Sequence, residues 1–510
     1  MLRNRRTALH HPTLPLLLFL LCCAAPAAAQ PVFNVLYHGA VADGQTPNTQ
    51  AIQAAIDRAH QSGGGVVLFP AGVYLSGSVY LKSNVELRLA EGATLLGSAR
   101  RFDYERITWH ALILAKNQEN IAITGAGTID GQGAALAADV VRLVKDSIIK
   151  DPYWGNNRPH ERERPQLIEF VGCKNARVSG VLLKNSACWV QTYQACDGLL
   201  VENVRVESMA YWNNDGIDLV DCRNVVVRNC TINSADDGIC LKSSYPPAFC
   251  ENILIENCTV RSSASALKLG TASKVGFRKV RVRNLKVFDT YRSAVALEIV
   301  DGGFMEDIEV SHIEAKNTGN AVFIRLGHRN KNGAVGSIRN IRIHDITVET
   351  PNARPDAGYP FEGPEVTDPH NLIPSSISGL PGHPVRDVSL ENIVIRFGGG
   401  GHRDRAYVPL DSLDRVPERP HDYPEFSMFG ELPAWGFYVR HVENLRMKNI
   451  RLECLSPDFR PALVFDDAQG LQLRQIKFKS PGKRMEEAVF RRVSNLEVKK
   501  VRVRKKITDW

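Results

Sequence analysis

Two short acidic motifs carry the residues of this chain that could do chemistry. The first reads NNDG at residues 213–216 and contains Asp215, and the second reads DDG at 236–238 and begins with Asp236 and Asp237. If the fold brings these three carboxylates together, their repulsion raises the pKa of at least one and leaves a neutral acid beside ionised bases. Inverting glycoside hydrolysis requires such an acid and base, about 6.5–9.5 Å apart, with a water molecule between them.

Two other interpretations of these motifs stay open. Asn-Asp-Gly and Asp-Asp-Gly tripeptides are most often simple turns. Clustered aspartates also suit a calcium site, because calcium prefers oxygen ligands. The separation of Asp215 and Asp236 along the chain is close to the period of the repeat described next. We therefore expect them one above the other on adjacent coils, with their backbones about 5 Å apart.

A six-residue phrase recurs through most of the chain. Its order is apolar, polar, Asn-like, apolar, polar, apolar, which is the alternation of a short strand. Early phrases follow one another at a nearly constant spacing, and later ones are separated by longer insertions. Stacking one phrase on the next predicts a parallel β-solenoid, in which each coil buries its apolar face against its neighbours. The phrases begin at Val178, Val201, Val227, Ile255, Val282, Val310, Ile343, Leu390, Met447, Leu473 and Val498.

Other segments predict how this solenoid is completed. Residues Thr49 to Gln61 have apolar side chains at helical spacing, so we expect a short N-terminal helix that caps the open end. We expect residues 30–510 to form a single all-β domain with long loop insertions near 351–385 and 399–436. Asparagines recur at one place in the phrase, where they could form turns or a ladder of amide hydrogen bonds. They are Asn229, Asn257, Asn284, Asn392 and Asn449.

The N-terminal segment, 1–29, has the features of a cleavable export signal. Three arginines, at positions 3, 5 and 6, precede the apolar stretch LPLLLFLLCCAA at 14–25, and AAA follows at 27–29. We expect cleavage after Ala29 and a secreted or periplasmic product. A lipoprotein signal at Cys22 or Cys23 is the alternative. The apolar stretch is shorter than the about 20 residues that a membrane span needs.

Charge and cysteine content limit the remaining classes. The net charge of +8 falls to +5 without the three leader arginines, which is too small an excess to indicate nucleic-acid binding. Nine cysteines follow the leader and include no CxxC pair that would suggest zinc. We expect buried thiols stacked on successive coils, while one or two disulfides stay open. The stacked thiols would be Cys173, Cys196, Cys222 and Cys250.

Around the acidic motifs the chain resembles glycoside hydrolase family 28, the polygalacturonases and related pectin-degrading hydrolases. The family's NTDG and DD motifs are matched at 213–216 and 236–237, and similar stretches lie at 33–44, 63–98, 125–133, 186–196 and 376–393. The resemblance covers essentially the whole mature chain. It implies a right-handed parallel β-helix that needs no metal or other cofactor. It also implies Asp236 as the general acid, with Asp215 and Asp237 activating the water.

Two motifs of that family are replaced in this chain. Ser265 stands where the family has the His of Gly-His-Gly. Ala296 and Glu298 stand where it has the Arg and Lys of Arg-Ile-Lys, which grip a galacturonate carboxylate. A buried carboxylate needs a cation. We therefore expect another cationic residue to bind the galacturonate carboxylate, or Glu298 to accept a hydrogen bond from a hydroxyl of a different sugar. The candidates for substrate binding are Asn213, Lys242, Lys268, Arg292, Arg325 and Glu298.

Three functions are consistent with these observations. The first, which we favour, is an exported monomeric glycoside hydrolase that cleaves pectic polysaccharide or oligosaccharide, with a galacturonide as the expected substrate. The second is a calcium-dependent polysaccharide lyase on the same architecture. The third is a non-catalytic β-helix that binds carbohydrate. No nucleic acid or membrane partner is expected.

Overall fold

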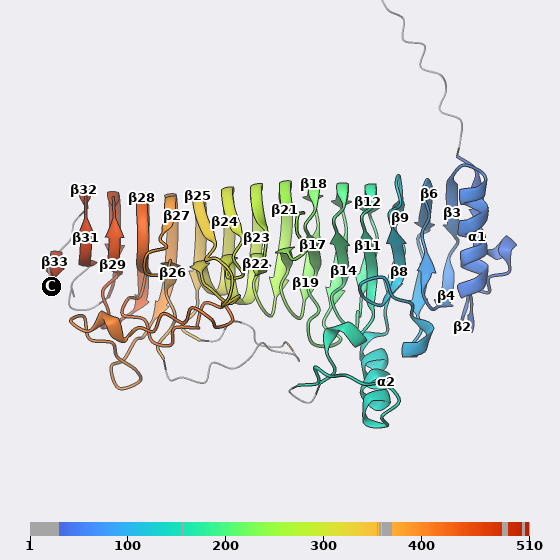
Figure 1. Ribbon diagram of the computed structural model, residues 1–510, viewed down its shortest axis with the longest axis horizontal. Coiled ribbons are helices and arrows are strands. Elements are labelled where there is room, and N and C mark those ends of the chain that lie inside the picture. The colour runs from blue at the N-terminus through green and yellow to red at the C-terminus, as the bar shows by residue number, and fades with distance from the viewer. Residues whose placement is uncertain are drawn as a thin grey trace, which may run out of the picture.

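The computed structural model describes residues 30–155, 158–353, 355, 359, 370–481, 488–501 and 505–508. These residues contain 33 strands and two α-helices, and they form the elongated parallel β-helix seen from the side in Figure 1. The parallel β-helix predicted from the repeated phrase is thereby confirmed. The predicted export signal, residues 1–29, lies outside the described residues.

Each coil contributes strands to three parallel sheets. The cleft sheet contains β5 (Val79–Tyr80), β8 (Ala111–Lys116), β11 (Gln166–Val171), β14 (Gln191–Gln194), β17 (Ile217–Val220), β20 (Ile239–Ser243), β22 (Leu267–Ser273), β26 (Ser375–Ser378), β29 (Leu463–Gln469), β31 (Ala488–Ser494) and β33 (Lys505–Thr508). The broad sheet contains β1 (Val32–Asn34), β3 (Gly65–Phe69), β6 (Val85–Leu89), β9 (Ala122–Gly125), β12 (Lys174–Ser179), β15 (Asp197–Glu202), β18 (Arg223–Arg228), β30 (Gln472–Lys479) and β32 (Glu497–Lys499).

The third sheet is built mainly from the N-terminal half of the chain. It contains β2 (Asp43–Pro47), β4 (Gly72–Ser76), β7 (Ala93–Gly97), β10 (Thr128–Asp130), β13 (Leu182–Lys184), β16 (Arg205–Ser208) and β19 (Thr231–Ser234). Six longer strands bend from one sheet into the next. They are β21 (Cys250–Ser262), β23 (Gly276–Ile299), β24 (Phe304–Leu326), β25 (Ser337–Thr350), β27 (Val385–Gly399) and β28 (Phe437–Ser456).

The strand register confirms the sequence repeat. The first residue of every predicted phrase pairs with the first residue of the next, from Val178 with Val201 to Leu473 with Val498. The nine described cysteines are all buried and free, so none of them forms a disulfide. The four expected to stack each immediately precede residues that are paired on successive coils, so they line the core as small apolar groups.

Two helices lie outside the coils. Helix α1 (Thr49–Gln61) has the predicted bounds, and it caps the N-terminal end of the solenoid with its buried Ile52, Ala55, Ile56 and Ala59 (Figure 1). Helix α2 (Gly133–Lys145) was not predicted, and it projects from the lower side of the solenoid in that view. Within the described part of the chain, neither helix has the length and apolarity to cross a membrane.

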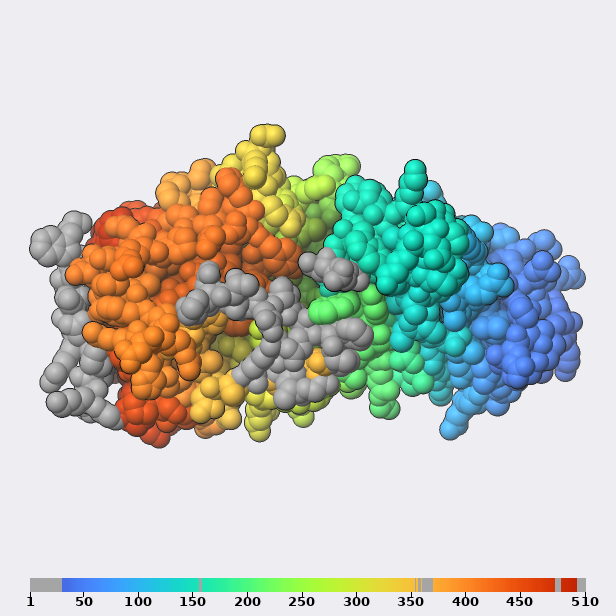
Figure 2. Space-filling model, turned by 90° about the horizontal axis from the view of Figure 1, so that it is seen from below, coloured from blue at the N-terminus to red at the C-terminus, as the bar shows by residue number. Residues whose placement is uncertain are grey.

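The two predicted insertions differ in structure. Strand β26 lies inside the range 351–385 and pairs with β24 and β28. This part of the predicted insertion is therefore a strand of the solenoid. Residues 354, 356–358 and 360–369 lie outside the described residues. Residues 400–436 form a loop between β27 and β28 that contains the short 3-10 helix η4 (Leu413–Arg415). From below, this loop and the segment around α2 stand on either side of a hollow over the middle coils (Figure 2).

Candidate active site

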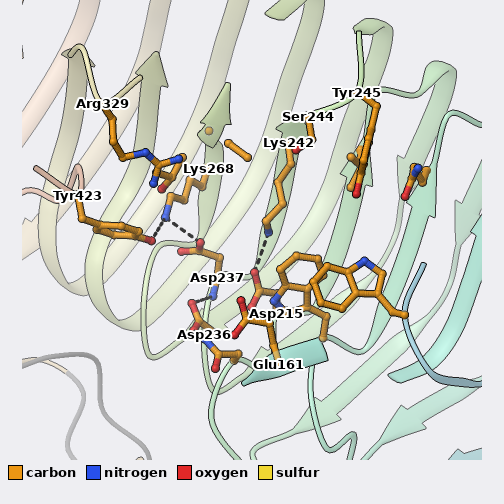
Figure 3. Close-up of a pocket in the computed structure, with 18 residues that line it drawn as sticks. Glu161, Asp215, Asp236, Asp237, Lys242, Ser244, Tyr245, Lys268, Arg329 and Tyr423 are labelled. Atoms are coloured by element: carbon orange, nitrogen blue, oxygen red, sulfur yellow. Dashed lines mark hydrogen bonds and ion pairs between the residues drawn. The ribbon is translucent and has the colours of Figure 1, made fainter. Parts of the chain in front are cut away.

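The strand register brings the two acidic motifs together, with one correction to the expected stacking. Strands β17 and β20 pair Ile217 with Ile239, so Asp215, which precedes Ile217 by two positions, lies opposite Asp237. Asp236 was expected at this position. One turn of the solenoid is here one residue longer than the separation of Asp215 and Asp236, so Asp237 takes the place opposite Asp215. Carboxylate oxygens of Asp215 and Asp237 lie within 4.8 Å of one another. All three aspartates line the same cleft (Figure 3).

Asp236 is held in place by its neighbours and by Asn213. Its Oδ1 accepts a hydrogen bond of 2.9 Å from the backbone N–H of Asp237, and its Oδ2 accepts one of 3.4 Å from Asn213 Nδ2. The Oδ1 of Asn213 in turn accepts a hydrogen bond of 2.7 Å from the buried Arg164. Asn213, a predicted substrate contact, therefore also orients Asp236. Arg164 was missed because it lies in a loop without a recognisable pattern.

Lys242 lies beside Asp215. Its Nζ donates to Asp215 Oδ2 at 2.9 Å, also bonds the buried Asp218, and stands 4.4 Å from the centroid of the Trp189 ring. One ammonium group cannot fully neutralise two buried carboxylates. Accordingly, burial raises the pKa of Asp218 to about 6 and that of Asp215 well above its usual range, although Lys242 opposes both shifts.

Lys268 forms the corresponding ion pair with Asp237. Its Nζ lies 3.0 Å from Asp237 Oδ2 and donates to the hydroxyl of Tyr423 at 3.1 Å. Tyr423 belongs to the 400–436 loop, so a distant insertion completes the site (Figure 3). The backbone N–H of Ser265 donates to the other oxygen of Asp237 at 3.0 Å.

The adjacent carboxyl groups differ in their affinity for a proton. Burial and the neighbouring charge of Asp237 raise the pKa of Asp236. Burial would raise the pKa of Asp237 as well, but Lys268 and two further cations outweigh it and hold that pKa below its usual range. Asp236 is partly exposed, whereas Asp237 is buried. The site therefore pairs an accessible carboxyl group that holds its proton more tightly with a buried one that gives up its proton more readily.

The cleft that contains these groups has a volume of about 280 Å³. Aromatic side chains line one part of it, including Trp109, Trp189 and Tyr245. Arg329 and Tyr423 line the part toward the C-terminal coils. A mostly preformed cleft with a few polar groups and aromatic walls suits a sugar ligand, whose ring faces are apolar and whose edges carry hydroxyls.

A metal ion could in principle use oxygens of Asp215 and Asp237 with the thiol of Cys240, because these ligand atoms lie within 4.8 Å of one another. However, Lys242 and Lys268 each engage one oxygen of these carboxylates. Two ammonium groups supply the positive charge that a cation would otherwise bring, and the thiol is a poor ligand for calcium. The donor set therefore does not fit the calcium site considered above.

The sequence model of glycosyl hydrolases family 28 matches residues 65–354, more than half of the chain. The chain belongs to this family. Family 28 is thus the context in which the replaced motifs of this chain have to be interpreted.

Curated relatives and solved structures agree with this membership. A probable polygalacturonase of Vitis vinifera is 27% identical over 336 residues, which cover 61% of this chain and 60% of the relative. The exo-poly-alpha-D-galacturonosidase of Dickeya chrysanthemi is 29% identical over 254 residues, 42% of each chain. The chain thus spans less than two thirds of the length of these relatives. The exopolygalacturonase structure from Thermotoga maritima, 21% identical with a TM-score of 0.56, covers 82% of this chain and 91% of its own, and it shows the shared fold.

Two predicted substrate contacts of this family 28 member lie away from the cleft lining. Arg325 is buried, and its guanidinium donates to the carbonyls of Gly379 and Glu418 at 3.2 and 2.5 Å. Glu298 is also buried, accepts from Thr271 Oγ1 at 3.2 Å and lies 4.0 Å from Lys268. Neither is among the described residues that line the cleft. Burial raises the pKa of Glu298 to about 7.

The remaining cation, Arg292, is buried as well and pairs with Glu425 at 3.3 Å. Its charge lowers the pKa of Asp237, so it acts on the carboxylates at a distance. Sequence reasoning did not single out Arg329 or Tyr423. Arg329 follows the end of β24, and Tyr423 lies in a loop with no periodic pattern, so only the folded chain reveals that both line the cleft.

Proposed function

We propose that this chain is an exported glycoside hydrolase that cleaves a galacturonide of pectin with inversion at the anomeric carbon. The observation that carries the proposal is the pair of adjacent carboxyl groups, Asp236 and Asp237, whose pKa values shift in opposite directions within one cleft. The similarity to a probable polygalacturonase of Vitis vinifera and to the exo-poly-alpha-D-galacturonosidase of Dickeya chrysanthemi supports a galacturonide as substrate.

In the proposed reaction, the carboxyl group of Asp236 donates its proton to the glycosidic oxygen as the bond from that oxygen to the anomeric carbon breaks. A water molecule attacks that carbon from the opposite face. Asp237, kept ionised by Lys268, takes a proton from this water, and Asp215 helps to hold it. After product release, Asp237 returns its proton to solvent and Asp236 regains one.

The proposal is tested with products resolved from homogalacturonan, rhamnogalacturonan and short oligogalacturonides. We expect hydrolysis of galacturonides without added calcium, and insensitivity to a chelator. An unsaturated, ultraviolet-absorbing product that disappears with chelator would instead establish the lyase. Binding without any product would leave only the non-catalytic function. Export predicts a mature protein that begins at Gln30, which mass spectrometry of the secreted form would detect.

A further inference from the structure

The cleft has three cationic side chains among its described lining residues: Lys242, Lys268 and Arg329. The first two pair with the catalytic carboxylates, and their side chains are only 13% and 3% exposed. The side chain of Arg329 is 36% exposed. Figure 3 shows it at the end of the cleft toward the C-terminal coils, with Tyr423 beside it and Tyr245 at the other end. Arg329 is therefore the cation of this lining that substrate can reach.

The guanidinium of Arg329 is already oriented by a carboxylate whose side chain is only 8% exposed, that of Asp301. Its Nε donates to Asp301 Oδ1 at 2.9 Å and its Nη2 donates to Asp301 Oδ2 at 2.7 Å. Asp301 also accepts the backbone N–H of Ser273 at 3.2 Å, which fixes it in turn. A guanidinium has five N–H donors. The pair with Asp301 engages one edge, so the opposite edge, formed by Nη1 and the second hydrogen of Nη2, can meet another carboxylate with two parallel bonds.

We propose that Arg329 binds the carboxylate of one galacturonosyl unit of the substrate. This unit lies next to the scissile bond, on the side toward the C-terminal coils of the solenoid. This inference rests on the proposed function and deepens it. The residues at the family's Arg and Lys positions, Ala296 and Glu298, lie on β23, and Arg329 follows the adjacent strand β24. In this proposal, the cation that selects a uronate lies one coil further along the solenoid than the Arg and Lys of the family motif. Because methyl esterification removes the negative charge, Arg329 makes the enzyme prefer the free acid to the ester.

The test compares a trigalacturonide with its methyl ester as substrates of the wild type and of Arg329→Gln. We expect the variant to raise KM for the acid about 10- to 100-fold, the range for hydrogen bonds to a charged group, and to change KM for the ester little. Arg278→Gln is the matched control. Arg278 donates through Nε and Nη2 to Glu251 at 2.9 and 2.7 Å and is 34% exposed, but it lies in the part of β23 that continues the broad sheet from β18 through Glu251. This control should leave the preference for the acid unchanged.

A binding measurement separates recognition from turnover. Digalacturonate is titrated calorimetrically into Asp236→Asn with and without Arg329→Gln, and we expect the second change to weaken binding about 10-fold or more. If Arg329→Gln is too unstable to measure, Arg329→Lys keeps the charge without the two-bond geometry and should give an intermediate loss for the acid alone.

The outcomes also separate the two proposals. A wild type that cleaves no galacturonide overturns the proposed function, and the assignment of Arg329 falls with it. A wild type that cleaves galacturonide, combined with an Arg329 variant that keeps the acid preference or loses acid and ester equally, overturns the assignment of Arg329 alone.

Discussion

Asp236 and Asp237 are neighbours in the chain, yet their partners give them different tasks. Asp236 accepts hydrogen bonds from the backbone N–H of Asp237 and the amide of Asn213, whereas Asp237 has the ammonium of Lys268 at 3.0 Å. Replacing Asp236 with Asn removes the transferable proton and keeps the shape. We expect kcat to fall by about 10²-fold or more, with the affinity for digalacturonate retained. Steady-state kinetics and calorimetry measure the two quantities, and Asp307→Asn, on the broad sheet, should change neither.

The charge of Lys268 sets the protonation of the base. Burial raises the pKa of Asp237, and Lys268 is the largest force that lowers it, so Lys268→Met should raise that pKa. Hydrolysis needs Asp237 ionised, so the acidic limb of the profile of kcat/KM against pH should move to higher pH. The alkaline limb, which reports loss of the proton from Asp236, should move less. An acidic limb that stays in place in this variant would contradict the assignment of Asp237 as base.

The sequence predicted which aspartates and which two lysines, Lys242 and Lys268, form the site. It did not predict how these residues pair with one another. The motifs placed Asp215, Asp236 and Asp237 in one patch, as the cleft confirms. The stacking of Asp215 on Asp237 depends on the exact length of the coil between them, which a single inserted or deleted loop residue changes. Arg325 was a reasonable candidate by residue type, but its outward position on β24 is covered by the 400–436 loop, whose path the sequence did not indicate.

Many bends between neighbouring sheets, including one within β21, contain an asparagine in a left-handed conformation. Asn257 has a φ of +56°, and its Oδ1 accepts a hydrogen bond of 3.0 Å from Asn284 Nδ2 on the next coil. Asn257→Ala should destabilise the fold by about 1–2 kcal/mol, because alanine tolerates this φ poorly and cannot accept the bond. Asn257→Gly keeps the conformation and should lose less. Urea unfolding measures both, and equal losses would show that the backbone conformation is not the cause.

Most strands were predictable from the sequence, whereas strand β26 and helix α2 were not. A phrase that repeats each coil gives many independent indications of one register, so its eleven copies stack as expected. Strand β26 has only four residues, so nothing in its sequence distinguished it from the insertion. Helix α2 interrupts the solenoid between β10 and β11, where the family resemblance drew attention to the preceding strand rather than to the helical spacing of GAALAADVVRLVK.

The whole molecule is a stack whose ends need protection. Helix α1 buries Ile56 completely against the first coils, while Arg58 on the same helix is exposed. Ile56→Ala should destabilise the protein by about 2–5 kcal/mol through the cavity it leaves. It should also expose the strand edges of the first coil, and such exposed edges favour association of the N-terminal ends of two molecules. Chemical unfolding and sedimentation velocity measure these effects. Arg58→Ala is the control, and equal effects of the two changes would show that the cap does not act through its buried face.

The anomeric configuration of the first product tests the central claim most directly. A trigalacturonide is mixed with the wild-type enzyme, and proton NMR follows the newly formed reducing end before it mutarotates. If Asp236 protonates the glycosidic oxygen while Asp237 activates water on the opposite face, the first product has the configuration opposite to that of the bond cleaved. A first product with the same configuration, or an unsaturated one, would contradict this account.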